Sequence, residues 1–148
     1  MAEIRFYHLG RGSVIRALPR LLSKGLQTGR RIVVRVDSSS VAEKLAADLW
    51  TYDPDSFLPH GTATDGHAPH QPIWITTGDE NPNGATMMVN LCNLETLSFD
   101  GYDLVCDIFD GNNEAEKNMA RARWSSLKDT GANLTYWQQT ETGWEKKA

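Results

Sequence analysis

Short apolar runs alternate with stretches of helical periodicity along this chain, and this alternation restricts the fold more than any other feature. Ile32–Val36 (IVVRV) is the clearest strand, because β-branched residues without polar alternation are typical of a strand buried on both faces. Further strands are expected at Ile4–His8, Ile73–Thr76, Met87–Leu91, Leu104–Phe109 and Leu134–Gln138. The alternation predicts the α/β class: a single three-layer domain over residues 1–148, with a mostly parallel central sheet and Rossmann-like topology.

One helix is expected from Ser40 to about Asp53. Ser40 and Glu43 have the spacing of a capping box, in which each side chain satisfies a backbone N–H of the other residue. Pro54 ends the helix, because a proline disfavours the α conformation of the residue before it. A stripe at helical spacing faces the core: Ala42, Leu45, Ala46 and Leu49.

Apolar residues at the end of this helix form a candidate docking surface. Trp50 lies at the edge of the apolar stripe, and Phe57, Leu58 and Pro59 follow in a segment that is expected to be a surface loop. Adjacent apolar residues beside a tryptophan need a cover. They either fold back on their own domain or form a patch that docks another protein.

The turn Gly10–Ser13 (GRGS) lies where a dinucleotide-binding fold places its phosphate loop. Position 15 is isoleucine instead of the third glycine of that motif, so the expected topology has no nucleotide-binding loop. Ser13 is interpreted as the N-cap of a helix that continues to about Lys24. Pro19 implies that this helix is kinked or begins later. A nucleotide-binding or hydrolytic α/β enzyme that uses the turn is the alternative function.

Composition argues against several classes of protein. The net charge of −4 argues against a general nucleic-acid binder, which is normally basic over its whole domain. Cys92 and Cys106 are too few for a disulfide scaffold and lack the spacing of metal ligands, so both are expected to be reduced core thiols. No run approaches the length of a membrane span, and the first residues lack the apolar centre of a signal peptide. A cytoplasmic protein without a membrane partner is expected.

A histidine cluster, comprising His60, Asp65, His67 and His70, has the residue types that hold zinc. The surrounding glycine- and proline-rich segment offers no rigid support, so His67 and His70 are expected to be solvated. His60 either caps the turn or contacts a partner. No histidine partner for a cysteine nucleophile can be argued from the spacing. No metal, no cofactor and no catalytic site are expected.

A basic stripe lies on the long helix expected at Asn113–Thr130, which Gly131 ends in the C-cap position. Met119, Ala120 and Leu127 form the arc of this helix that faces the core. The stripe lies on an adjacent face and consists of Lys117, Arg121, Trp124 and Lys128. It is either a solvated surface with the tryptophan folded inward or a shallow groove for a short acidic peptide, with Trp124 or Phe109 as the apolar wall.

The segment around the candidate docking surface resembles the chi subunit of bacterial DNA polymerase III. The shared features are a helix ending in LW, a short acidic spacer with a proline, and the sequence SFLPH. In that family this segment abuts the psi subunit of the clamp loader. The resemblance implies clamp-loader contacts at Trp50, Phe57, Leu58, Pro59 and His60.

The long helix carries a second resemblance to the same family. KNMARARWSSLKDTGANL is similar to the family pattern K-x-x-AR-x-R-(Y/W) followed by a G-x-NL turn. In the family this helix binds the acidic C-terminal tail of single-stranded-DNA-binding protein, which implies tail contacts at Lys117, Arg121 and Trp124. Ser125 replaces a basic residue of the family, and Lys128 can compensate for it. Arg123 points toward the core arc and is interpreted as a buried arginine paired with a carboxylate.

The implied function is that of a non-catalytic adaptor in the DNA polymerase III holoenzyme. One surface would contact a psi-type subunit of the clamp loader, and the other would contact the tail of single-stranded-DNA-binding protein. DNA would be reached only indirectly, through that second partner.

Overall fold

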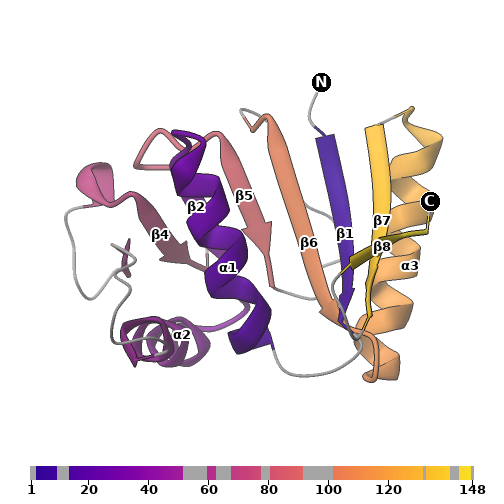
Figure 1. Ribbon diagram of the computed structural model, residues 1–148, viewed down its shortest axis with the longest axis horizontal. Helices are drawn as coiled ribbons and strands as arrows, with labels where there is room; N and C mark the ends of the chain where they lie inside the picture. Colours follow the sequence, from indigo (N-terminus) through magenta and orange to yellow (C-terminus); the bar gives the residue numbers. More distant parts are fainter. Residues whose placement is uncertain are drawn as a thin grey trace.

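The computed structural model describes residues 3–9, 14–51, 60–62, 68–77, 81–91, 102–131, 133–140 and 144–147 (Figure 1). Within these ranges, the side chains of residues 14–17, 49–51, 60 and 68 are not described. The described part of the chain forms a single α/β domain around one sheet.

The sheet contains eight strands within the described residues, in the order β3-β4-β2-β5-β6-β1-β7-β8. The strands are β1 Glu3–Leu9, β2 Ile32–Arg35, β3 His60–Gly61, β4 Ile73–Thr76, β5 Met87–Asn90, β6 Leu104–Asp110, β7 Asn133–Gln139 and β8 Trp144–Lys146. All neighbours pair in parallel except β7 and β8, which are antiparallel. The six strands predicted from sequence are confirmed, while β3 and β8 were not predicted.

Helices cover both faces of the sheet (Figure 1). Helices α1 (Val14–Gln27) and α2 (Ser39–Thr51) lie on one face, and α3 (Glu114–Asp129) lies on the other, behind β7 in this view. A short 3-10 helix, η1 (Ala68–His70), precedes β4. The predicted three-layer fold with a mostly parallel sheet is therefore confirmed. Strand β1 lies between β6 and β7, so the connection through α1 to β2 passes over β6 and β5.

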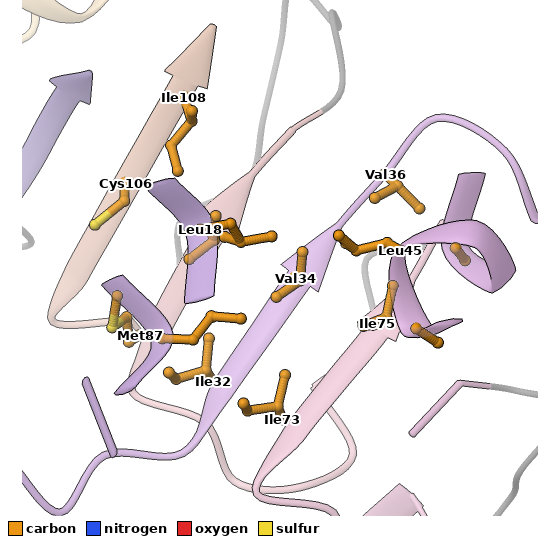
Figure 2. Packing of buried hydrophobic residues seen from close by; sticks show 14 of the residues in the cluster. Leu18, Ile32, Val34, Val36, Leu45, Ile73, Ile75, Met87, Cys106 and Ile108 are labelled. Carbon is orange, nitrogen blue, oxygen red and sulfur yellow. The ribbon is translucent and has the colours of Figure 1, made fainter. Parts of the chain in front are cut away.

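The face beneath α1 and α2 has an aliphatic core (Figure 2). Ile32 and Val34 of β2 point toward Leu18 of α1 and Leu45 of α2. All four residues of β2 are buried, which confirms that this strand is interior. Val33 points the other way and belongs to the core on the α3 face.

The expected start of one helix was wrong, and for another helix one of two alternatives is excluded. Helix α2 begins at Ser39, and the side chain of Ser38 accepts a hydrogen bond from the Val41 backbone N–H at 3.3 Å. Ser40 thus lies inside the first turn, and Glu43 accepts instead from the Thr62 hydroxyl at 2.8 Å. Helix α1 begins at Val14 and continues through Pro19, so a later start is excluded.

Candidate protein-binding site on helix α3

Helix α3 has well-defined ends, which fix the position of each side chain along it. The Asn113 side chain accepts a hydrogen bond from the Glu116 backbone N–H at 3.1 Å, as an N-cap residue does. Gly131 follows the helix with φ of 76°, a conformation that costs glycine little and other residues more. The predicted helix and both of its ends are confirmed.

A buried ion pair fixes how α3 sits on the sheet. Arg123 Nε donates to Asp107 Oδ2 at 2.6 Å, and Arg123 Nη2 donates to Asp107 Oδ1 at 2.8 Å. Both side chains are nearly inaccessible to solvent, and Asn90 of β5 lies 3.5 Å from the same carboxylate. Two parallel hydrogen bonds restrict rotation and sliding of the helix more than apolar contact does. The predicted pairing of Arg123 with a carboxylate is confirmed.

Trp124 rests on aromatic rings contributed by two strands. Its ring lies edge-on to Phe6 of β1, with ring centres 5.3 Å apart, and to Tyr136 of β7, with ring centres 5.8 Å apart. Trp124 is half-buried, so its inner part packs on the sheet while the remainder reaches the surface. Such edge-to-face contacts hold an aromatic ring in a defined orientation.

His8 and Tyr136 extend this aromatic surface toward the carboxyl end of β1. The His8 Nδ1 atom and the Tyr136 hydroxyl share a hydrogen bond of 2.6 Å. Phe109 lies next to both rings, but it is only 1% exposed and supports them from beneath. The aromatic groups at the surface are therefore His8, Trp124 and Tyr136, each half-buried.

The basic residues of α3 border these rings. Lys117 is 24% exposed at its side chain and lies 3.7 Å from Glu114, and Arg121 and Lys128 are exposed. The positive charge acts on the His8 ring. Burial and the charges of Lys117 and Arg121 lower the pKa of His8, whereas Asp110 opposes this shift. The surface thus combines local positive charge with aromatic area, the composition that suits an acidic peptide with an apolar group.

The family comparison covers the region that contains this site up to the residue before Tyr136. Residues 1–135 match the family described as "DNA polymerase III chi subunit, HolC". The chain belongs to this chi subunit family. The predicted resemblance is therefore confirmed, and it extends from β1 into β7.

Two curated relatives bear chi subunit names. The "Probable DNA polymerase III subunit chi" of Rickettsia prowazekii is 33% identical over 89 residues, which are 60% of this chain and 54% of that protein. The "DNA polymerase III subunit chi" of Haemophilus influenzae is 28% identical over 113 residues, which are 74% of this chain and 76% of that protein. The match thus spans about half the length of the Rickettsia protein.

The second predicted surface of this chi family member lies mostly outside the described residues. Trp50 belongs to α2 and His60 to β3, but the side chains of both are outside the description. Phe57, Leu58 and Pro59 lie outside the described ranges altogether. The docking surface therefore stays a prediction from sequence.

The alternative sites are also only partly described. The turn at 10–13, together with Asp65 and His67, lies outside the described residues, and His70 is exposed in η1. Among the residues that the structure describes, no group of three or more histidine, cysteine, aspartate and glutamate side chains could hold a metal ion. None of the described helices is long and apolar enough to cross a membrane.

Cys106 is a buried free thiol on β6, as the sequence predicted. Burial raises its pKa to about 12, so the group stays protonated at neutral pH and is a poor nucleophile. Cys92 lies outside the described residues.

Sequence reasoning missed His8 and Tyr136 as parts of the α3 surface, and Phe6 as a buried ring that contacts Trp124. Alternation along β1 places Phe6 and His8 on the same face, which is a visible signal in IRFYHL. Their meeting with Tyr136 depends on the pairing of β1 with β7. Strands so far apart in the sequence cannot be paired from local patterns alone.

Proposed function

We propose that this chain is a non-catalytic adaptor that links the replicative clamp loader to the acidic C-terminal tail of single-stranded-DNA-binding protein. The observation that carries the proposal is the row of basic side chains on α3 beside half-buried aromatic rings. Membership of the chi subunit family supports a role at the replicative polymerase. The chain would act in the cytoplasm and contact DNA only through its partner.

The α3 surface has the dimensions of a short peptide site. Lys117 and Lys128 are separated by about 16 Å along the helix axis at 1.5 Å per residue, the length of about five extended residues. Arg121 lies between them and can hold both oxygens of one carboxylate, whereas a lysine acts as a point charge. An apolar terminal side chain would lie on Trp124 and Tyr136.

The contact with the clamp loader is proposed at the end of α2. Trp50, Phe57, Leu58, Pro59 and His60 would contact a psi-type subunit, on the strength of the family resemblance. Two modest affinities joined in one chain raise the local concentration of each partner near the other. No chemical step is required of such a protein.

Replacing the central arginine tests the peptide site. Arg121→Ala should weaken binding of a peptide with the sequence of the acidic tail by about 1.5–3 kcal/mol, the usual range for a hydrogen bond to a charged group. Affinity in the unchanged protein should also fall as salt is raised, because the contacts are exposed. Isothermal titration at low and moderate salt measures both effects.

Lys24→Ala is the matched control for this experiment. Lys24 is an exposed cation in the last turn of α1, on the opposite face of the sheet, so its loss removes one charge without touching α3. Equal affinities of the unchanged protein and the Arg121→Ala variant would refute the assignment of the site. A thermal shift caused by a nucleotide instead would favour the alternative of a nucleotide-binding enzyme.

A further inference from the structure

His8 and Tyr136 form a polar pair inside the aromatic part of the α3 surface. Their hydrogen bond of 2.6 Å joins β1 to β7, and both side chains are half-buried. The His8 ring also lies against the turn after β6, where a Cβ atom at Gly111 would collide with the imidazole. The imidazole therefore packs near the rings of Phe109 and Tyr136 and against a turn that leaves no room for a Cβ atom at position 111.

Charged groups from α3 and β6 surround this pair. Burial lowers the pKa of His8, Lys117 and Arg121 of α3 act in the same direction, and Asp110 at the end of β6 acts against them. Tyr136 on β7 keeps its proton at neutral pH, because burial raises the pKa of its hydroxyl although Arg121 opposes the shift. In the free protein the imidazole is consequently neutral at neutral pH.

We propose that His8 and Tyr136 are part of the peptide-binding site and that His8 takes up one proton from solvent when a carboxylate binds beside Lys117 and Arg121. This inference rests on the proposed function of the α3 surface and adds a subsite to it. A bound carboxylate neutralises the two cations that repel a proton from His8 and adds a negative charge of its own. Both changes favour the imidazolium over the neutral ring.

The hydrogen bond between His8 and Tyr136 links the protonation of His8 to the contact with the ligand. With a neutral imidazole, the Tyr136 hydroxyl can donate its proton to Nδ1. A protonated His8 has no acceptor, so Nδ1–H donates to the Tyr136 oxygen and the hydroxyl proton turns outward. The same hydroxyl then donates to the bound carboxylate. One proton enters from solvent and forms the N–H bond at Nδ1, and no other covalent bond changes.

The sign of the pH effect follows from this proton uptake. The complex holds more protons than the free protein, so affinity must rise as the pH falls through the interval between the pKa of free His8 and its higher pKa in the complex. The pKa of His8 in the free protein lies below the ordinary value of about 6.5. Peptide carboxylates stay ionised above about pH 5. Binding should therefore tighten about threefold to tenfold between about pH 7.5 and about pH 5.5.

The experiment is a titration calorimetry series with a short synthetic peptide that has acidic residues before an apolar C-terminal residue with a free carboxylate. At each pH it is run in two buffers of different ionisation enthalpy, which yields the number of protons taken up. The unchanged protein should take up a fraction of a proton near pH 6.5. His8→Gln should bind with no proton uptake and with a flat pH profile.

Two further variants separate a specific role from a structural one. His70→Gln removes another exposed histidine, in η1 at the far end of the sheet order, and should keep the full pH dependence. Tyr136→Phe keeps the ring but removes the hydroxyl, so it should keep proton uptake at His8 and lose more affinity at the lower pH than at the higher pH.

The outcomes distinguish this inference from the proposed function. Binding by the unchanged protein without proton uptake, or an equal pH profile in His8→Gln, would overturn the role of His8 alone. A lack of binding at either pH would overturn the peptide site itself, and the inference with it. If His8→Gln does not fold, Tyr136→Phe still decides: an equal loss of affinity at both pH values would contradict the coupling.

Discussion

The two faces of the sheet differ in the kind of side chain that packs on them. The face under α1 and α2 is filled mainly by aliphatic side chains from the strands and both helices, with Tyr7 and Trp137 as its aromatic members (Figure 2). The face under α3 holds the Arg123–Asp107 ion pair and a cluster of aromatic rings that reaches the surface. An aliphatic face requires only that volume be filled, whereas polar and aromatic groups also require defined orientations. The proposed binding surface lies on the face with defined orientations.

One row of residues across the sheet shows how the α3 face is organised. From β4 to β7 the register aligns Thr76, Arg35, Asn90, Asp107, Phe6 and Tyr136. The first four are polar and buried, and the last two are aromatic. The row changes from polar to aromatic residues between Asp107 and Phe6. Helix α3 places Arg123 over Asp107 and Trp124 over Phe6. Two successive residues of α3 thus contact the polar half and the aromatic half of this row.

The largest expected effect comes from breaking the ion pair. Arg123→Met should cost about 3–5 kcal/mol of unfolding free energy at neutral pH, because it leaves a buried carboxylate without its cation. Burial raises the pKa of Asp107, so in this variant the folded state binds a proton that the unfolded state releases at the same pH. Stability of the variant should therefore be lost as the pH rises, and the cost should be smaller at about pH 5 than at about pH 8. Urea unfolding at both pH values measures this difference.

A double variant is the control for this prediction. Changing Asp107→Leu together with Arg123→Met removes both charges and should recover much of the lost stability. It should still bind the acidic peptide less well than the unchanged protein, because the ion pair no longer fixes the position of Arg121 and Trp124. Full recovery of both stability and binding would contradict a positioning role for the pair.

A smaller effect is expected on the aliphatic face. Leu22 of α1 is fully buried there, and Leu22→Met conserves its volume. The expected cost is less than about 1.5 kcal/mol, because a well-packed aliphatic core tolerates swaps of similar size. Peptide affinity should not change. A loss of affinity in this variant would show that packing on the α1 and α2 face affects the binding surface on the α3 face.

The sequence predicted what local patterns control. The ends of α3 were predicted correctly because Asn113 and Gly131 have strong positional preferences at helix ends. The buried position of Arg123 was predicted correctly because helical spacing places it on the side that faces the core. The start of α2 was wrong because serines occupy three consecutive positions, 38–40, and each is a good N-cap. With α2 beginning at Ser39, Glu43 makes a tertiary contact, because it accepts a hydrogen bond from the Thr62 hydroxyl.

The candidate site could be predicted only in part, for the same reason. Lys117, Arg121 and Trp124 share one helix, so their spacing alone places them together. Phe6, His8 and Tyr136 join them through the insertion of β1 between β6 and β7. That order depends on how all strands pack, which periodicity within one segment does not encode.

The most direct test of the account is to map where the acidic tail binds. Isotope-labelled protein is titrated with the tail peptide, and changes in the backbone amide resonances are followed by NMR. We expect changes in α3 around Arg121 and in the facing residues of β1 and β7, with α1 and α2 unaffected. Changes confined to α1 or α2, or none at saturating peptide, would contradict the assignment of the binding surface to the α3 face.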